Sequence, residues 1–287
     1  MKKQDPTILR AMELLRTNWI HSVHLLREAA DKHPKEPSYQ IALGDVFYSR
    51  GSHDKALQHY LIALSMDPSD QQSIAMIANC YLYTGEYRLA LAYFQKILNP
   101  TDDVLYNTAV AQAFLGKHDD CIATLKSILP RFPNHPFVYF MLVEQYYYLR
   151  NYEEAMRYIH LAKQYAGIHY QLYLLSAVIY FEKEHYLLAY ENFRMASEFN
   201  IIANTEQLIS YARSAREAGL YKEAIRIFED ITKRYPQLSD AWVELIKLHI
   251  DLGNFNEARK NLALAKAKLS RTSSIFRVLQ ERLKEQE

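Results

Sequence analysis

The sequence contains one candidate metal site. His21 and His24 are three residues apart and Glu28 follows four residues later. Imidazole and carboxylate groups are ligands that zinc accepts, so this spacing on one helix permits ligation. No second helix with matching ligands is identifiable, and these groups alone do not define a site for a particular metal. We therefore interpret the three residues as a solvated or half-packed helix face and expect no bound metal.

A thiol site and a phosphate-binding loop are also disfavoured. With only Cys80 and Cys121, the chain has neither a disulfide framework nor a four-thiolate metal site, and we expect both thiols to be buried. The segment Gly116–Asp120, GKHDD, resembles a phosphate loop in composition but not in spacing, and is interpreted as a turn. Motifs of the forms G-x-G-x-x-G, G-x-x-x-x-G-K-S/T, H-E-x-x-H and G-x-S-x-G do not occur. We expect no catalytic residues, no cofactor and no enzymatic activity.

The composition is that of a protein that folds in water. Of its 287 residues, 49% are hydrophobic and 23% are charged. The net charge of +1 supplies no overall field that would attract nucleic acid or an anionic membrane. Apolar runs such as Leu172–Phe181 fall short of the roughly 20 residues of a membrane helix, and MKKQDPTILRAM lacks the apolar core of a signal peptide. We expect a cytoplasmic protein, bacterial in style, with no nucleic-acid partner and no membrane insertion.

The few glycines predict an all-α fold. The chain has 7 glycines beside 23 tyrosines. An open α/β sheet uses glycine in its phosphate loops and tight turns, and β-hairpins use Asn-Gly or Asp-Gly pairs, which the sequence lacks. Helices are the elements that this composition favours.

Small residues and prolines recur with a period of about 34. Gly51 and Gly85 are 34 residues apart, as are Gly219 and Gly253. A second series recurs every 31 to 35 residues: Ala56, Ala90, Cys121, Ala155, Ala189, Ala224 and Ala258. Prolines recur about twelve residues after this series or its equivalent: Pro34, Pro68, Pro133 and Pro236. Two helices per repeat then give eight repeats: residues 3–36, 37–70, 71–101, 102–135, 136–169, 170–204, 205–238 and 239–272.

The second repeat carries a recognisable pattern. Positions 7, 8, 11, 15, 20, 24, 27 and 32 are Leu43, Gly44, Phe47, Gly51, Ala56, Tyr60, Ala63 and Pro68. This pattern resembles the tetratricopeptide repeat, and the resemblance extends over residues 3–272 as a single array. Small residues at positions 8, 20 and 27 let two helices approach closely, so each repeat is predicted to be an antiparallel helix pair. The resemblance implies an all-α, right-handed α-solenoid superhelix with a concave groove.

Local departures from the pattern are also expected to matter. Arg150 and Glu184 replace the turn glycine, so those turns must use a non-glycine conformation or a different bend. In the short third repeat, Asn99-Pro100 is predicted to end the second helix early. Position 17 carries a ring in every repeat, which can cover the turn between helices. Residues 273–287 place three apolar side chains on one stripe and are predicted to form a solvating terminal helix.

In tetratricopeptide proteins, positions 2, 5, 9 and 12 of each repeat face the groove. The resemblance therefore implies a non-enzymatic scaffold that binds a partner peptide or helix there. Repeats four to six place an aromatic stretch on this wall: Tyr106, Phe140, Tyr147 and Phe181. The other candidate groove residues are Tyr48, Asn79, Asn107, Glu144, Arg213, Arg216 and Lys247. The alternative is that neighbouring inner helices bury these rings against each other.

Members of the family that clamp a chaperone's C-terminal carboxylate use two asparagines and three cations. The best match here keeps Asn79 and Asn107 but lacks every cation, so this mode of binding is disfavoured. Basic residues occur later, as Arg213, Arg216 and Lys247, in company with several acidic residues. An internal salt-bridge network is favoured there over an anion site.

Other classes of function remain as alternatives. The chain could instead be a self-assembling structural protein whose tyrosine-rich surfaces make a homo-oligomer. An enzyme would require a deep pocket with convergent acid and base residues, which no motif indicates. Binding of RNA is disfavoured by the near-neutral charge and by the lack of a regular basic ladder.

Overall fold

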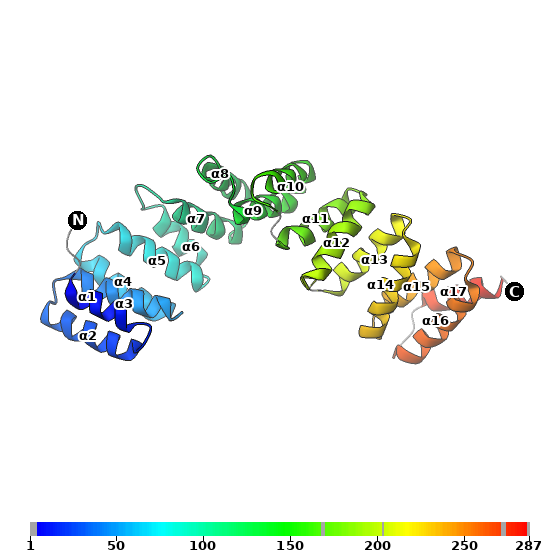
Figure 1. Ribbon diagram of the computed structural model, residues 1–287, viewed down its shortest axis with the longest axis horizontal. Helices are drawn as coiled ribbons and strands as arrows, with labels where there is room; N and C mark the ends of the chain where they lie inside the picture. Colours follow the sequence, from blue (N-terminus) through cyan, green and yellow to red (C-terminus); the bar gives the residue numbers. More distant parts are fainter. Residues whose placement is uncertain (1–4, 168–169, 203, 271–273, 286–287) are drawn as a thin grey trace. The chain divides into compact units, whose positions relative to one another are not determined.

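The protein is all-α in the computed structural model, which describes residues 5–167, 170–202, 204–270 and 274–285 (Figure 1). Of the described residues, 77% are helical, and the described ranges contain no strand. The helices are α1 (Pro6–Leu14), α2 (Trp19–Lys32), α3 (Pro37–Ser49), α4 (His53–Met66), α5 (Gln71–Tyr83), α6 (Tyr87–Phe94), α7 (Asp102–Phe114), α8 (His118–Ile128), α9 (Pro136–Tyr148), α10 (Tyr152–Tyr165), α11 (Tyr170–Glu182), α12 (Tyr186–Glu198), α13 (Thr205–Glu217), α14 (Tyr221–Arg234), α15 (Ser239–Asp251), α16 (Phe255–Lys268) and α17 (Ser274–Lys284). The predicted all-α repeat fold is confirmed.

Each of the eight predicted repeats contains two successive helices, and α17 follows the last of them. A few residues assigned to repeats or to the terminal helix lie outside the described ranges: 3, 4, 168, 169, 203, 271–273, 286 and 287. The chain packs as two compact bodies, an N-terminal body ending at Val138 and a C-terminal body beginning at Tyr139. The interpretation as one array over residues 3–272 stays a prediction.

Small residues allow the two helices of a repeat to pack closely. Every member of the alanine and cysteine series at position 20 is fully buried. Gly44 shows how little room there is, because a Cβ built on it would lie 2.5 Å from Cε1 of Tyr60. Tyr60 is itself fully buried and donates a hydrogen bond from its hydroxyl to Asp45 Oδ1 at 2.6 Å. Larger side chains at these positions would force the helix pair apart.

The turn between the two helices has the same hydrogen bond in repeats two to eight. Each turn has one residue in the left-handed conformation. The residue that follows it donates its N–H to the carbonyl five residues earlier, as in Ser52 to Phe47 at 2.9 Å and His185 to Tyr180 at 2.8 Å. This bond is that of the Schellman motif, which needs a positive φ at the preceding position. Arg150 and Glu184 adopt it with φ of 54° and 59°, beside 71° for Gly51. The sequence left two alternatives for these turns, a different bend or the same bend formed by a residue other than glycine. The structure shows the same bend, with Arg150 and Glu184 in the left-handed conformation.

The ring at position 17 is the first residue of the second helix in all eight repeats. In the N-terminal body two of these rings, His53 and Tyr87, stack on the following repeat. His53 lies parallel to Tyr83 with ring centroids 4.8 Å apart, and Tyr87 lies parallel to Phe114 at 4.4 Å. The predicted cover over the turn is therefore also a contact between repeats, worth about 0.5–1.5 kcal/mol per ring pair.

The second helix of repeat three is short, and an additional helix packs on the last repeat. Helix α6 ends at Phe94, earlier than α4 or α8 in relative position, so the early end predicted for repeat three is correct. The helix stops before Asn99-Pro100, and Gln71 holds the linker by accepting the Leu98 N–H at 3.0 Å. At the other end, α17 buries Phe276, Leu279 and Leu283 against the last repeat.

His249 on α15 is buried without a hydrogen-bond partner. Its side chain is 5% exposed, and both ring nitrogens lack a partner among the described residues. Burial lowers the pKa of this imidazole below its ordinary value of 6.5. The folded protein therefore holds His249 neutral at pH values where the unfolded chain protonates it.

We expect Arg150→Gly and Glu184→Gly to stabilise the fold. Each variant removes a side chain from a left-handed residue, and we expect the free energy of unfolding to rise by about 0.5–1 kcal/mol. The measurement is the midpoint of chemical denaturation. Gly219→Ala is the matched control, because φ is 77° there and a Cβ would meet nothing within 4 Å. That variant should lower the midpoint, and a fall in all three variants would show that the turns are not strained.

We also expect His249→Phe to stabilise the fold, by about 1–2 kcal/mol at neutral pH, because it removes two unsatisfied nitrogens. Since the pKa of His249 is lowered by folding, the wild-type protein should lose stability as the pH falls below 6.5, and the gain of the variant should grow there. Denaturation midpoints between pH 5 and pH 8 measure this, with the exposed His160→Gln as control. A gain that shrinks at low pH would contradict the assignment.

Candidate functional site

The C-terminal body contains a groove made of two adjoining hollows along α9, α11 and α13. The first has a volume of about 490 Å³ and is lined by Phe140, Glu144, Tyr147, Tyr170, Gln171, Leu174, Leu175, Val178, Asn200, Ile201 and Gln207. The second has a volume of about 630 Å³ and is lined by Tyr147, Val178, Phe181, Glu182, Phe193, Asn204, Thr205, Glu206, Gln207, Ile209, Ser210, Arg213, Leu238 and Asp240. The hollows share Tyr147, Val178 and Gln207, so they form one continuous surface.

Three first helices of successive repeats position the groove residues. On α9, Phe140, Glu144 and Tyr147 are four and then three residues apart, which places them on one helix face. Two equivalent positions of α11, Leu174 and Val178, line the same hollow. The predicted residues Phe140, Glu144, Tyr147, Phe181 and Arg213 thus line one continuous groove in this body. Each is partly exposed, so neighbouring helices do not bury these side chains completely.

Aromatic contacts hold two of the rings on the groove side. The rings of Tyr147 and Tyr152 have centroids 6.0 Å apart, and Phe181 meets the ring of Tyr186 edge-on at 5.7 Å. Tyr152 and Tyr186 are the first residues of α10 and α12, so the second helix of each repeat supports a groove ring of the first. Burial raises the pKa of Tyr147, which keeps its hydroxyl protonated as a hydrogen-bond donor.

Glu144 is a carboxylate in largely apolar surroundings. The Gln145 side-chain amide donates a hydrogen bond from Nε2 to Oε2 of Glu144 at 3.5 Å. Within the described part of the chain it pairs with no cation, and burial raises its pKa. A partly desolvated carboxylate without a cationic partner gains from any ligand group that donates hydrogen bonds or carries positive charge.

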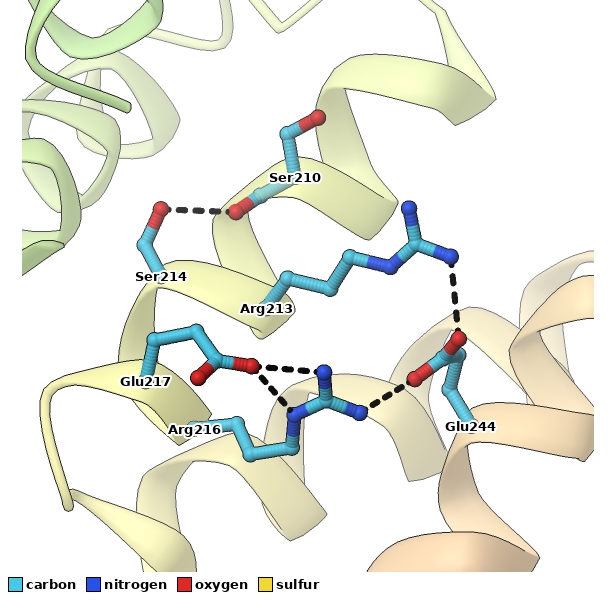
Figure 2. A network of polar contacts seen from close by, with 6 residues as sticks. All are labelled: Ser210, Arg213, Ser214, Arg216, Glu217 and Glu244. Carbon is cyan, nitrogen blue, oxygen red and sulfur yellow. Dashed lines mark hydrogen bonds and ion pairs between the residues drawn. The ribbon is translucent and has the colours of Figure 1, made fainter. Parts of the chain in front are cut away.

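The basic residues of α13 belong to an ion-pair network with α15. Arg213 Nη2 lies 2.9 Å from Glu244 Oε1, and Arg216 Nη1 lies 2.5 Å from Glu244 Oε2 (Figure 2). Arg216 also pairs with Glu217 at 2.6 Å. Burial opposes the charge of Arg216, yet hydrogen bonding to Glu217 and the charge of Glu244 raise its pKa. The favoured prediction of an internal salt-bridge network is correct for Arg213 and Arg216 but not for Lys247, which forms no ion pair with any described residue. Arg213 and Arg216, named as groove candidates, thus already have partners in this body.

The other predicted groove residues have varied surroundings. Lys247 on α15 is partly exposed and forms no ion pair with any described residue. In the N-terminal body, Asn107 donates a hydrogen bond from Nδ2 to Asn79 Oδ1 at 2.9 Å, so the two asparagines satisfy each other. Tyr106 stacks on His135 at 5.6 Å, and Tyr48 meets His53 edge-on at 5.1 Å. The four candidates of the N-terminal body line neither of the two hollows: Tyr48, Asn79, Tyr106 and Asn107.

Several groove residues were not among the predicted candidates. Leu174 and Val178 occupy positions 5 and 9 of repeat six, which the repeat pattern assigns to the groove wall, although neither was chosen as a candidate. Asn200 and Ile201 come from the linker after α12, where Asn200 has a φ of 54°. No repeat position marks this linker, so the sequence offers no signal for it.

The residues considered for other chemistry have ordinary surroundings. Cys80 and Cys121 are buried as predicted, and burial raises the pKa of Cys80 to about 12, so its thiol stays protonated. His24 Nδ1 lies 3.6 Å from Glu28 Oε1 on an exposed face. Among the described residues, no cluster of three or more histidine, cysteine or acidic side chains could hold a metal ion. No described helix has the length and apolar character to cross a membrane.

The repeated helix pairs and the groove along their first helices define a helical-repeat protein. Models of the tetratricopeptide repeat match residues 22–71, 103–135 and 215–276, about half of the chain together. The chain belongs to the tetratricopeptide repeat family, whose members generally serve as protein-interaction scaffolds. A search of curated protein sequences gave no significant match.

Solved structures with the same fold come from proteins of low sequence identity. PilF of Pseudomonas aeruginosa has a TM-score of 0.58 at 19% identity, covering 74% of this chain and 96% of its own. A tetratricopeptide repeat protein of Parabacteroides merdae has a TM-score of 0.56 at 15% identity, covering 86% and 98%. YrrB, described as having an unusual peptide-binding site, has a TM-score of 0.53 at 18% identity, covering 63% and 94%. At this identity the similarities establish the fold.

We expect Glu244→Gln to destabilise the protein by about 1–3 kcal/mol, because it leaves two arginines without their shared counter-charge. Arg213→Gln should cost less, since the Arg213 side chain is 40% exposed and Arg216 would still pair with Glu244. Chemical denaturation of the two variants measures both effects. A larger loss from Arg213→Gln would show that the network does not depend on the carboxylate.

Proposed function

We propose that this protein is a non-enzymatic scaffold that binds a segment of a partner protein in the groove along α9, α11 and α13. The observation that carries the proposal is the continuous surface formed by the two hollows, about 490 and 630 Å³ in volume. An extended peptide or a helix is the shape that fits a groove crossing several first helices. The family supports this class of function, because its members generally serve as interaction scaffolds.

The make-up of the groove supports binding rather than catalysis. Partly exposed aromatic side chains supply much of the binding energy at protein interfaces. Phe140, Tyr147 and Phe181 are such side chains. All three line the hollows, and the ring of Tyr147 also contacts Tyr152 on the second helix of its own repeat. The carboxylates of the groove would repel a nucleic-acid backbone, so a protein partner is favoured. We propose a cytoplasmic location on the balance of charged and apolar residues.

A second candidate function, self-assembly into a homo-oligomer, rests on a different surface. The ring stacks at the helix turns of the N-terminal body leave Tyr83 60% and Phe114 65% exposed. Such rings could dock against a second copy. Light scattering coupled to size exclusion separates the two candidates, since Tyr83→Ser with Phe114→Ser would dissolve an oligomer made through these rings and would leave groove binding unchanged.

We expect Phe140→Ala with Tyr147→Ala to abolish binding in the groove. The probe is a peptide selected from a random twelve-residue display library on the wild-type protein. Truncating a central aromatic anchor typically costs 2 kcal/mol or more, so the dissociation constant should rise at least about thirtyfold.

The matched control for this double variant is Tyr165→Ala with Tyr235→Ala, which removes two exposed rings outside the hollows. The control should leave the dissociation constant within about twofold, since rings outside an interface contribute little to binding. Circular dichroism checks that both variants keep their helices. Full binding by the groove variant, or equal loss in the control, would contradict the proposal.

A further inference from the structure

The charges along the groove are mostly negative. Four carboxylates line the two hollows: Glu144, Glu182, Glu206 and Asp240. Within the described part of the chain, none of the four forms an ion pair. Among the described residues that line this surface, Arg213 is the one cation, and its charge is matched by Glu244 from α15. The groove therefore carries an excess of negative charge, although the whole chain is nearly neutral.

Glu144 is the member of this group that lies in the aromatic part of the groove. Phe140, Tyr147 and Tyr170 line the same hollow, and no other charged side chain of the described residues does. The faces of aromatic rings attract cations, and they do so more strongly where water is excluded. A cationic side chain in this hollow would therefore meet a carboxylate and aromatic rings together.

An anionic or a neutral side chain would fit the same hollow less well. An anion would lie close to the Glu144 carboxylate and would be repelled. A neutral apolar side chain would remove water from the carboxylate and leave its charge without compensation. Burial already raises the pKa of Glu144 in the free protein, which is the sign of a carboxylate short of favourable contacts.

The groove surface around this hollow determines which other residues of the partner would fit. Apolar side chains of α11, Leu174 and Val178, lie beside Phe140 and call for apolar residues in the partner. Further along, Glu182, Glu206 and Asp240 line the second hollow and favour additional positive charge. The charge of this groove is negative, whereas a groove that binds a carboxylate requires cations on the protein.

We propose that the partner segment is a basic and apolar peptide, with a lysine or arginine side chain inserted beside Glu144 among Phe140, Tyr147 and Tyr170. The apolar residues next to this cation pack on Leu174 and Val178. Further basic residues of the segment face the carboxylates of the second hollow. This inference rests on the proposed function, because it names the kind of partner for the same groove.

The experiment is a selection of twelve-residue peptides from a random display library on the wild-type protein and on Glu144→Gln. On the wild-type protein, enriched peptides should contain lysine or arginine next to leucine, isoleucine or an aromatic residue. On Glu144→Gln the enrichment of the cation should fall while the apolar residues remain. Glu191→Gln, at an exposed position of α12 outside both hollows, is the matched control and should select the same peptides as wild type.

One selected peptide is then measured by calorimetry with its central cation intact and with norleucine in its place. The wild-type protein should bind the norleucine peptide about tenfold more weakly, a difference of about 1.4 kcal/mol. Glu144→Gln should bind the two peptides within about threefold of each other. Enriched peptides that are neutral or acidic, or a cation preference that survives Glu144→Gln, would overturn the inference and leave the groove as a binding site. No enrichment of any peptide would overturn the proposed function itself.

Discussion

The close approach of two helices at small residues is the constraint on which the rest of this structure depends. Alanine or cysteine at position 20 of repeats two to eight is fully buried, and Gly44 leaves no room for a Cβ against Tyr60. Because each pair packs this closely, the orientation of its first helix about its own axis is determined. That orientation places Phe140, Glu144 and Tyr147 on the groove face of α9, while the fully buried Leu142 and Val143 face away from the solvent.

The sequence predicted the helix pairs well because their signals are periodic and local. The turn glycines, the position-20 series and the rings at position 17 all recur at fixed spacing, and each has one structural role that the helices realise. Arg150 and Glu184 show the limit of that reasoning. The left-handed turn persists at both positions without glycine, since the hydrogen bonds from Asn151 and His185 back to the preceding helices hold the bend.

The site was harder to predict than the fold. Groove positions identify which side chains face the wall, and this was enough for Phe140, Tyr147 and Phe181. Position alone does not reveal which charges neutralise one another within the protein. The acidic residues near Arg213 and Arg216 in the sequence favoured an internal ion-pair network, but only the structure shows that Glu244 from the next repeat pairs with both. Glu144 has no such partner among the described residues, and this difference gives the groove its negative character.

The most direct test of this account is a crystal structure of the protein with a peptide selected from the display library. If the groove is the binding surface, the peptide will lie along α9, α11 and α13, cover Phe140 and Tyr147, and place a basic side chain beside Glu144. A peptide bound instead on the second helices, such as α10 and α12, or at the exposed rings of the helix turns, would contradict the claim that the groove is the binding surface.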